Sequence, residues 1–511
     1  MEKQPPQALP HVTAGSNISY WIDSMEPIKT TRLNENLKTD VVVIGGGIAG
    51  VTIAYQLLRS GQKVVLIEDG FIGSGETGRT TAHLVNALDD RYYDLQRIFG
   101  NENAGLIAQS HTSAIAFIEE LVKKENIDCD FTRVDGYLFL HPSDNKDSIE
   151  KELRAARESG VDVEEVSEVP GIVYTETPAI KFLRQAKFHP LKYLAGLCKA
   201  ITRDGGEIFT STHAREIDHT GIITDEGFTV HADHVVVATN SPVNNRFAMH
   251  LKQFAYRSYV IGALVEKDSL PDVLWWDTGD HEMNADLPPY HYVRLQPFND
   301  EFDLLISGGE DHPTGLADAV DFSEETRYAK LKGWTESKFP IGEIIFKWSG
   351  QVIEPMDSLA YIGRNPFDKD NVYIVTGDSG NGMTHGTIAG LLITDLINGK
   401  ENPWEKLYSP SRFKFFKSGK IFLKEFIGGL FAYMKTNPKH PETVELSSVK
   451  EGEGKIVELQ GEKFGVHRDK ANQLHIVAAE CTHLQCIKWN NDEKSWDCPC
   501  HGSRFTYDGK V

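Results

Sequence analysis

The 511-residue sequence predicts an α/β nucleotide-binding domain, an antiparallel β-sheet domain and a small cysteine-rich module at the C-terminal end. Three observations predict this architecture. Residues 40–69 have the pattern strand, glycine turn, helix and strand, and residues 246–312 contain strand-like runs separated by turns. Residues 481–502 hold four of the six cysteines together with two histidines. A chain of this length is expected to form two or three domains.

The composition narrows the class of protein. A hydrophobic content of 40 % with 25 % charged residues is typical of a soluble globular protein. The net charge of -21 argues against nucleic-acid binding, which depends on clustered Lys and Arg. The first residues lack the layout of a signal peptide, and no stretch approaches the roughly 20 apolar residues of a membrane span. We therefore expect a cytoplasmic protein, in which a cysteine cluster more often binds metal or acts in catalysis than forms disulfides.

The glycine turn in DVVVIGGGIAGVTIAYQLLRSGQKVVLIED predicts a dinucleotide site. Gly45, Gly47 and Gly50 have the GxGxxG spacing between an apolar strand and an amphipathic helix. Gly45 permits the tight turn, Gly47 lets the backbone approach a pyrophosphate, and Gly50 lets helix and strand pack closely. Glu68 ends the second strand and is placed to accept hydrogen bonds from a ribose hydroxyl. This pattern leaves FAD and NAD both open.

Five further segments indicate FAD. They are GSGETGRTTAHL at 73–84, FHPLKYLAGLCKAITRDGGEIF at 188–209, ADHVVVATNS at 232–241, EPMDSLAYIG at 354–363 and NVYIVTGDSGNGMTHGTIAGLLITDLI at 371–397. With them, residues 40–400 resemble the D-amino-acid oxidase type of FAD-dependent oxidoreductase, the glycine oxidase and sarcosine oxidase group. The resemblance implies an α/β FAD-binding Rossmann-like domain with an antiparallel-sheet substrate domain lying over the flavin.

The resemblance also implies further FAD-binding residues. They are Arg79, Thr80, Thr81, Gly377, Asp378, Gly382, Met383 and Thr384. In the resembling family, a helix that begins near Thr384 points its N-terminus at the flavin, where its dipole stabilises negative charge on the reduced ring. The alternative is a crossover helix that only covers the sheet. No cysteine stands in the GDSGNGMTHG turn, so we expect FAD to be bound noncovalently.

The C-terminal cysteines and histidines resemble a Rieske 2Fe-2S centre. The pattern is Cys481-x-His483 followed by Cys498-x-x-His501, and the resemblance implies that the two cysteines hold one iron and the two histidines the other. Cys486 and Cys500 resemble the extra pair that forms a disulfide in the Rieske proteins of respiratory quinol oxidases. The alternative is a zinc ribbon, because two cysteines and two histidines also suit tetrahedral zinc.

The residues after the second ligand pair suggest a low cluster potential. In high-potential Rieske proteins a serine and a tyrosine two residues on donate hydrogen bonds to the cluster sulfurs. Here Ser503 is kept, but Phe505 has no donor, so we expect a potential below the respiratory type. Rieske domains usually continue past this loop, whereas the sequence ends at YDGKV; either the chain is cut short or the cluster is more exposed than usual.

Three residues on the predicted substrate-domain strands are candidate substrate contacts. They are Arg257, Tyr259 and Arg294. A guanidinium is the natural bidentate partner of a substrate carboxylate. The alternative for each arginine is an ion pair with a local acid.

The expected domain boundaries follow from these motifs. Residues 1–35 form an N-terminal extension and residues 36–410 the oxidoreductase, with FAD-binding parts at about 36–90, 160–245 and 355–410 and a substrate domain at about 91–159 and 246–354. Residues 411–443 form a basic aromatic segment and linker, and residues 444–511 a small all-β Rieske domain. The basic segment either packs on the FAD domain or contacts a membrane surface or an acidic electron carrier.

An FAD domain joined to a Rieske module predicts a converter of two-electron into one-electron chemistry. We expect a dehydrogenase that oxidises an amine or amino-acid-like substrate by hydride transfer to FAD, with electrons passing singly to the cluster and on to an external one-electron carrier. One alternative reverses the flow, so that the cluster feeds a reductase. The other is a plain oxidase with the tail as a structural or docking module. The sequence names neither the substrate nor the oligomeric state.

Overall fold

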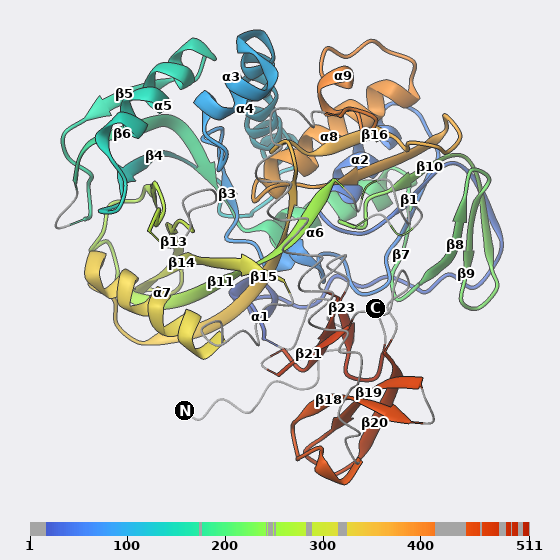
Figure 1. Ribbon diagram of the computed structural model, residues 1–511. Helices are drawn as coiled ribbons and strands as arrows, with labels where there is room; N and C mark the ends of the chain where they lie inside the picture. The colour runs from blue at the N-terminus through green and yellow to red at the C-terminus, as the bar shows by residue number, and fades with distance from the viewer. Residues whose placement is uncertain are drawn as a thin grey trace.

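The computed structural model of the chain contains an eight-stranded sheet, a nine-stranded sheet and a C-terminal module of two three-stranded sheets (Figure 1). It describes residues 17–172, 176–241, 243, 249, 252–282, 289–314, 324–413, 446–459, 462–479, 487–491, 493–498 and 504–509. In these parts of the chain no helix has both the length and the apolar character that crossing a membrane requires.

The eight-stranded sheet is the predicted α/β unit. Its strand order is β16-β17-β10-β1-β2-β7, with the hairpin β8–β9 attached to β10; β17, β10, β1, β2 and β7 are parallel. Its strands are β1 (Leu37–Ile44), β2 (Val64–Ile67), β7 (Glu207–Phe209), β8 (Ala214–Asp218), β9 (Gly221–Thr224), β10 (Thr229–Val237), β16 (Tyr361–Arg364) and β17 (Val372–Thr376). Its helices are α2 (Ile48–Arg59), α6 (Pro190–Arg203), α8 (Gly382–Ile397) and α9 (Glu405–Tyr408).

Both faces of this sheet are buried, which explains its unbroken apolar strands. Val41 and Val43 of β1 belong to the core that includes helix α2 and helix α8. Val42 and Ile44 point to the other face and belong to a separate core, which includes Ile222 of the β8–β9 hairpin. A parallel strand covered on both sides therefore keeps no polar face.

The nine-stranded sheet is mostly antiparallel and forms the predicted substrate domain. Its order is β15-β11-β14-β13-β12-β4-β6-β3, with β5 on β6, and only β12 and β4 pair in parallel. Its strands are β3 (His83–Leu84), β4 (Thr132–Leu140), β5 (Val163–Val166), β6 (Glu176–Lys187), β11 (Gln253–Glu266), β12 (Leu274–Asp277), β13 (Tyr292–Pro297), β14 (Phe302–Pro313) and β15 (Ile344–Pro355). The helices in this half are α3 (Tyr92–Phe99), α4 (Asn101–Lys124), α5 (Lys146–Glu158) and α7 (Glu324–Lys338).

Two boundaries differ from the expectation. We placed residues 160–245 in the FAD-binding part, but β5 and β6 lie in the nine-stranded sheet, because β6 pairs with β4 on one side and β5 on the other. The described part of the expected N-terminal extension is not a separate segment. Its helix α1 (Tyr20–Asp23) carries the fully buried Trp21, whose Nε1 donates to the carbonyl oxygen of Thr80 at 2.5 Å.

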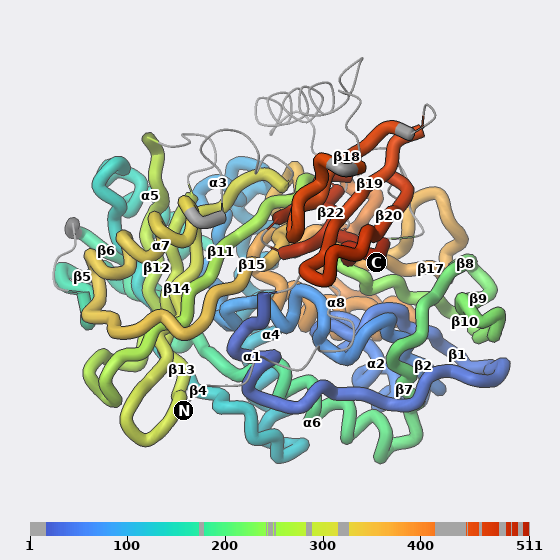
Figure 2. The backbone as a smooth tube through the Cα atoms, turned by 90° about the horizontal axis from the view of Figure 1, so that it is seen from below, coloured from blue at the N-terminus to red at the C-terminus, as the bar shows by residue number. Residues whose placement is uncertain are grey.

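The C-terminal module is all-β, as expected. One sheet contains β18 (Gly454–Leu459), β19 (Glu462–Arg468) and β20 (Leu474–Ala478), and the other β21 (Lys488–Asn490), β22 (Ser495–Asp497) and β23 (Arg504–Thr506). Trp496, Cys498 and Phe505 form the buried centre of the second sheet. Figures 1 and 2 both place the module next to α1 and β15. Most of the basic aromatic segment, residues 414–445, lies outside the described residues.

A buried histidine joins β12, β13 and β14. His291 Nδ1 lies 3.0 Å from Asp277 Oδ2, and its Nε2 lies 3.3 Å from Glu310 Oε1. The ring also stacks on Trp334, with centroids 4.1 Å apart. Burial disfavours the protonated ring, but the Asp277 carboxylate outweighs burial and raises the pKa of His291 to about 9.

The pairing of His291 with Asp277 predicts that the protein loses stability at alkaline pH. Because the pKa lies above the ordinary 6.5, the stabilisation is complete below pH 6.5 and is lost as the pH rises through about 9. We expect the free energy of unfolding to fall by about 3 kcal/mol over this window, at about 1.4 kcal/mol per pKa unit. Asp277→Asn should flatten the profile in denaturant titrations, whereas Asp268→Asn, at an exposed position, should not. Equal slopes in both variants would show that His291 is not protonated.

Candidate functional site

A cavity of about 1440 Å³ opens at the carboxyl ends of the parallel strands and extends between the two large sheets. Ile44, Ile67, Ala238 and Thr376 mark the ends of β1, β2, β10 and β17 in its wall. This edge is where α/β sheets bind nucleotides. Of the predicted cofactor residues, the cavity lining includes Gly45, Gly47, Glu68, Arg79, Thr80, Thr81, Asp378, Gly382 and Met383.

The glycine turn has the conformation that close approach requires. Gly45 has φ +108°, and a Cβ there would lie 2.3 Å from the carbonyl oxygen of Ala238. A Cβ on Gly50 would lie 1.9 Å from the carbonyl oxygen of Gly45. Gly50 itself is not in the lining; it lets α2 pack on the turn, while Gly47 is the N-cap of α2 and faces the cavity.

Glu68 closes the turn from the end of β2. Its carboxylate accepts hydrogen bonds from the backbone N–H of Gly46 at 2.6 Å and of Gly70 at 2.8 Å. Burial raises its pKa, although these two hydrogen bonds act in the opposite direction. The carboxylate is therefore fixed in the cavity wall by the backbone of the turn.

Helix α8 presents its N-terminus to the same cavity. The helix begins at Gly382, two residues before the expected start, and its N-cap Asn381 makes no side-chain capping bond. Gly382 and Met383 line the cavity, whereas Thr384 points away, with its Oγ1 2.8 Å from His111 Nδ1. Gly377, with φ +70°, shapes the preceding turn without lining the cavity. The N-termini of α2 and α8 face this cavity, and the glycine turn beside them has no room for a Cβ atom. This arrangement fits a bound dinucleotide such as FAD.

The three predicted substrate contacts are not brought together in this cavity. Arg257, Tyr259 and Arg294 are all buried, and none lines it. Arg294 Nη1 donates to the carbonyl oxygens of Ala82 at 2.8 Å and Phe188 at 3.0 Å. Tyr259 Oη lies 2.8 Å from His312 Nε2. Arg257 contacts the C-terminal module, as described below.

Carboxylates line the cavity instead, and sequence reasoning missed them. They are Asp89, Asp90, Asp311 and Glu354, which join Asp378. Ser379 Oγ lies 2.9 Å from Asp90 Oδ2 and 2.7 Å from Glu354 Oε2, and burial raises the pKa of both carboxyl groups. Burial raises the pKa of Asp89, Asp311 and Asp378 to about 6 each. The sequence did offer one signal for these carboxylates: two adjacent acids at 89 and 90 stand between an apolar run and an arginine.

Two histidines of the lining are neutral. Burial lowers the pKa of His83 to about 3 and that of His312 to about 4. The pKa values of the buried carboxyl groups in the lining therefore lie closer to neutral pH than the pKa values of these two imidazoles do.

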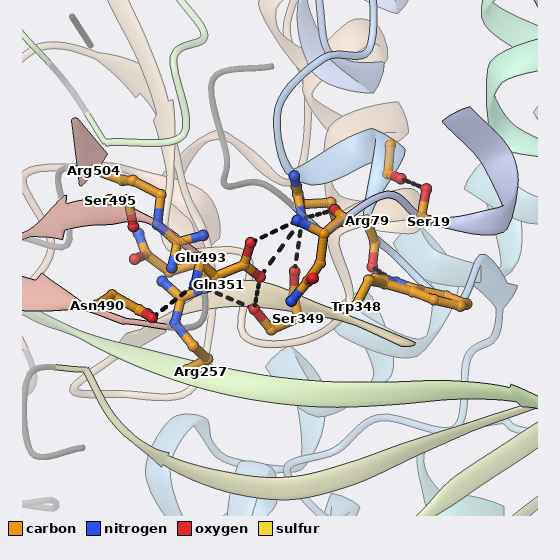
Figure 3. A network of polar contacts seen from close by, with 12 residues as sticks. Ser19, Arg79, Arg257, Trp348, Ser349, Gln351, Asn490, Glu493, Ser495 and Arg504 are labelled. Atoms are coloured by element: carbon orange, nitrogen blue, oxygen red, sulfur yellow. Dashed lines mark hydrogen bonds and ion pairs between the residues drawn. The ribbon is translucent and has the colours of Figure 1, made fainter. Parts of the chain in front are cut away.

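A buried network of charges joins the C-terminal module to the nine-stranded sheet and to the segment between β2 and β3 that carries Arg79 (Figure 3). On the module side, Glu493 precedes β22 and Asp497 ends it. Asp497 accepts from Arg504 Nε at 2.8 Å and from Arg257 Nη2 of β11 at 3.4 Å. Glu493 accepts from Ser349 Oγ at 2.6 Å, and its Oε1 lies 3.9 Å from Arg79 Nη1.

The module also contributes to the cavity itself. Arg504 and Phe505 of β23 are part of the lining. Cys498, which follows Asp497 directly, is fully buried beside Trp496 and Phe505. The predicted ligands Cys481, His483 and His501 and the predicted disulfide partners Cys486 and Cys500 lie outside the described residues, as does Ser503.

Comparison with known proteins assigns both parts of the chain. Residues 40–396 match the family described as FAD dependent oxidoreductase, and residues 441–511 match the Rieske 2Fe-2S domain. The chain belongs to the FAD-dependent oxidoreductase family. Its C-terminal module is a Rieske domain, so the cofactors are FAD and a 2Fe-2S cluster, and the zinc alternative is set aside.

Relatives of this oxidoreductase agree with the assignment. YhfW of Bacillus subtilis (strain 168), a protein named for a Rieske 2Fe-2S iron-sulfur centre, is 31 % identical over 96 % of this chain and 95 % of its own length. The γ-glutamylputrescine oxidoreductase of Escherichia coli (strain K12) is 26 % identical over 72 % of this chain and 85 % of its own. The crystal structure of glycine oxidase from Geobacillus kaustophilus has a TM-score of 0.61 at 20 % identity, covering 74 % of this chain and 100 % of that one. The last likeness shows the fold.

Substitution of Gly50 should remove FAD from this oxidoreductase. A methyl group at Gly50 would force α2 away from the turn, because the backbone oxygen of Gly45 cannot yield as a flexible side chain would. We expect Gly50→Ala to lower the flavin-to-protein ratio at least tenfold, measured by absorbance after gel filtration. Gly333→Ala, in helix α7 with open space around it, is the matched control and should keep its flavin. Full flavin content in Gly50→Ala would contradict the role of the turn.

Proposed function

We propose that this oxidoreductase is a dehydrogenase that oxidises an amine or amino-acid-like substrate and passes the electrons to an external one-electron carrier. When bound, FAD supplies the two-electron hydride acceptor and the cluster the one-electron step. The substrate loses two electrons and two protons at a C–N bond, which leaves an imine, and two carrier molecules each take one electron. The protein would act in the cytoplasm. The observation that carries this proposal is the shared wall: Arg504 and Phe505 of the Rieske module line the cavity that the glycine turn also lines.

The cavity lining also holds Arg79, Arg91 and Arg504, but the carboxylates clustered around Ser379 favour a cationic amine over an anionic substrate. Asp89, Asp90, Asp311, Glu354 and Asp378 line it, and the two arginines we expected to bind a carboxylate do not. A positive charge near these carboxylates would stabilise their ionised forms, which burial alone disfavours. One relative is named for γ-glutamylputrescine, which supports an amine as the substrate class.

An anaerobic titration tests the proposed electron route. The holoenzyme is mixed with candidate amines in the absence of oxygen, and flavin absorbance and the EPR signal of the reduced cluster are followed together. We expect a substrate to bleach the flavin and to produce the cluster signal. Bleaching of the flavin alone, with hydrogen peroxide formed in air at full turnover, would favour the plain oxidase. Reduction of the flavin only through a cluster-specific donor would favour the reverse flow.

The proposed substrate class predicts a matched difference between compounds and a dependence on pH. Amines without a carboxylate should reduce the flavin with KM at least tenfold lower than the corresponding amino acids. KM should rise as the pH falls through about 6, because Asp89 and Asp311 then become protonated. Asp311→Asn should raise KM for the amine, whereas the exposed Asp147→Asn should leave it unchanged. A preference for amino acids that is insensitive to pH would contradict the cationic substrate.

The aromatic residue at 505 predicts the direction of a shift in cluster potential. Phe505 is buried beside Cys498, and a tyrosine there would bring a hydroxyl donor toward the cluster. We expect Phe505→Tyr to raise the potential in EPR-monitored titrations. Tyr507→Phe removes a hydroxyl from a partly exposed side chain two residues on and should leave the potential unchanged. An unchanged cluster potential in Phe505→Tyr would contradict the inference that the missing hydrogen-bond donor lowers the potential.

A further inference from the structure

The charge network is buried on both sides of the interface between the Rieske module and the rest of the chain. The side chains of Arg79 and Glu493 are each 0 % exposed. Those of Arg257 and Asp497 are 3 % and 7 % exposed. The backbone N–H of Asn17 adds a third segment, since it donates to Glu493 Oε2 at 2.9 Å. Two carboxylates of the module therefore meet partners from three distant parts of the oxidoreductase.

Such a network fixes orientation more than it adds affinity. Charges taken out of water lose hydration, so their pairing contributes little net binding energy, but a wrong docking geometry leaves them buried and unpaired. The contacts lie at separate points of the module: Glu493 lies before β22 and Asp497 at its end, so the strand is held at both ends. One docked orientation of β22 satisfies both.

The held elements are those that border the two cofactor sites. Asp497 directly precedes Cys498, the one predicted cluster ligand that lies among the described residues. On the other side, Arg79 lines the cavity, and its carbonyl oxygen accepts from Trp348 Nε1 at 2.8 Å. The side chain of Arg79 reaches Glu493, as Figure 3 shows. The interface therefore connects the wall of the flavin cavity with the strand that leads to the cluster.

We propose that Arg79 and Arg257 are positioning residues that hold the Rieske module in one fixed orientation on the flavin cavity, through Glu493 and Asp497. Electrons exchanged between the two centres then cross this interface within one chain. This inference rests on the proposed function, because it assigns the contact surface that the electron route uses. The rate of electron tunnelling falls exponentially with distance, so a loosened module exchanges electrons slowly even when both centres are intact.

Two neutral substitutions on opposite sides of the interface test the proposal. Arg257→Met removes the charged contact from β11 to Asp497, which keeps its pair with Arg504 of the same module. Glu493→Gln removes the carboxylate that faces Arg79. Arg257→Lys keeps the charge and is the conservative variant. Arg364→Met is the matched control, because it removes a partly exposed ion pair with Glu405 at 2.7 Å, formed between β16 and α9. Flavin and iron content are measured first for every variant.

The readout is redistribution of electrons in the holoenzyme after a substoichiometric pulse of dithionite without oxygen. Flavin absorbance and freeze-quenched EPR of the cluster report the two centres. We expect redistribution to be at least tenfold slower in Arg257→Met and Glu493→Gln than in the wild type, and within threefold of it in Arg257→Lys and Arg364→Met. Wild-type rates in both neutral variants would overturn the proposal.

Calorimetry separates this inference from the proposed function. We expect the wild type and Arg364→Met to unfold in one transition, and the two neutral variants to show an earlier, separate transition of the module. Suppose that the wild type exchanges no electrons between its centres, while the two neutral variants still unfold in two transitions. In that case the electron route fails and the positioning role stands. Unchanged unfolding in both neutral variants would overturn the positioning role.

Discussion

The contact of Asp497 with Arg257, beside Arg504 of the same module, joins the two halves of this protein. Asp497 is buried and surrounded by two guanidinium groups, which, despite burial, lower the pKa of its carboxyl group far below its usual range. A carboxylate in that setting has no favourable position except beside its cations. Because Cys498 follows it directly, the position of this one side chain also sets the position of a predicted cluster ligand. The cavity wall formed by Arg504 and Phe505 depends on the same contact.

The cavity combines two kinds of charge control. At the nucleotide end, polarity comes from the backbone: a glycine turn and the N-termini of α2 and α8 supply N–H groups and positive dipole ends. Toward the nine-stranded sheet, side-chain carboxylates dominate, while burial keeps His83 and His312 neutral. An anionic cofactor and the cationic amine that we propose as substrate would each meet the complementary part of one continuous space.

The N-terminal segment shows how the parts of the chain depend on one another. Trp21 packs in the core and holds the carbonyl oxygen of Thr80, while Asn17 contacts Glu493 of the Rieske module. The ring of Trp21 also lies under the guanidinium of Arg294, at 5.3 Å. A residue that we expected to bind substrate is therefore part of the packing between segment and sheet.

The sequence by itself determined the features that rest on local pattern. Gly45, Gly47 and Gly50 lie within six residues of one another, and the cysteine and histidine pairs carry their spacing with them, so the α/β unit and both cofactors could be predicted. The tertiary structure alone decided which side chains meet across long separations. Arg257 finds Asp497 240 residues away, and β6 leaves the nucleotide half to pair with β4. An arginine on a strand has many acids of suitable chemistry available to it, and only the packing of the sheets selects the one that is buried with it.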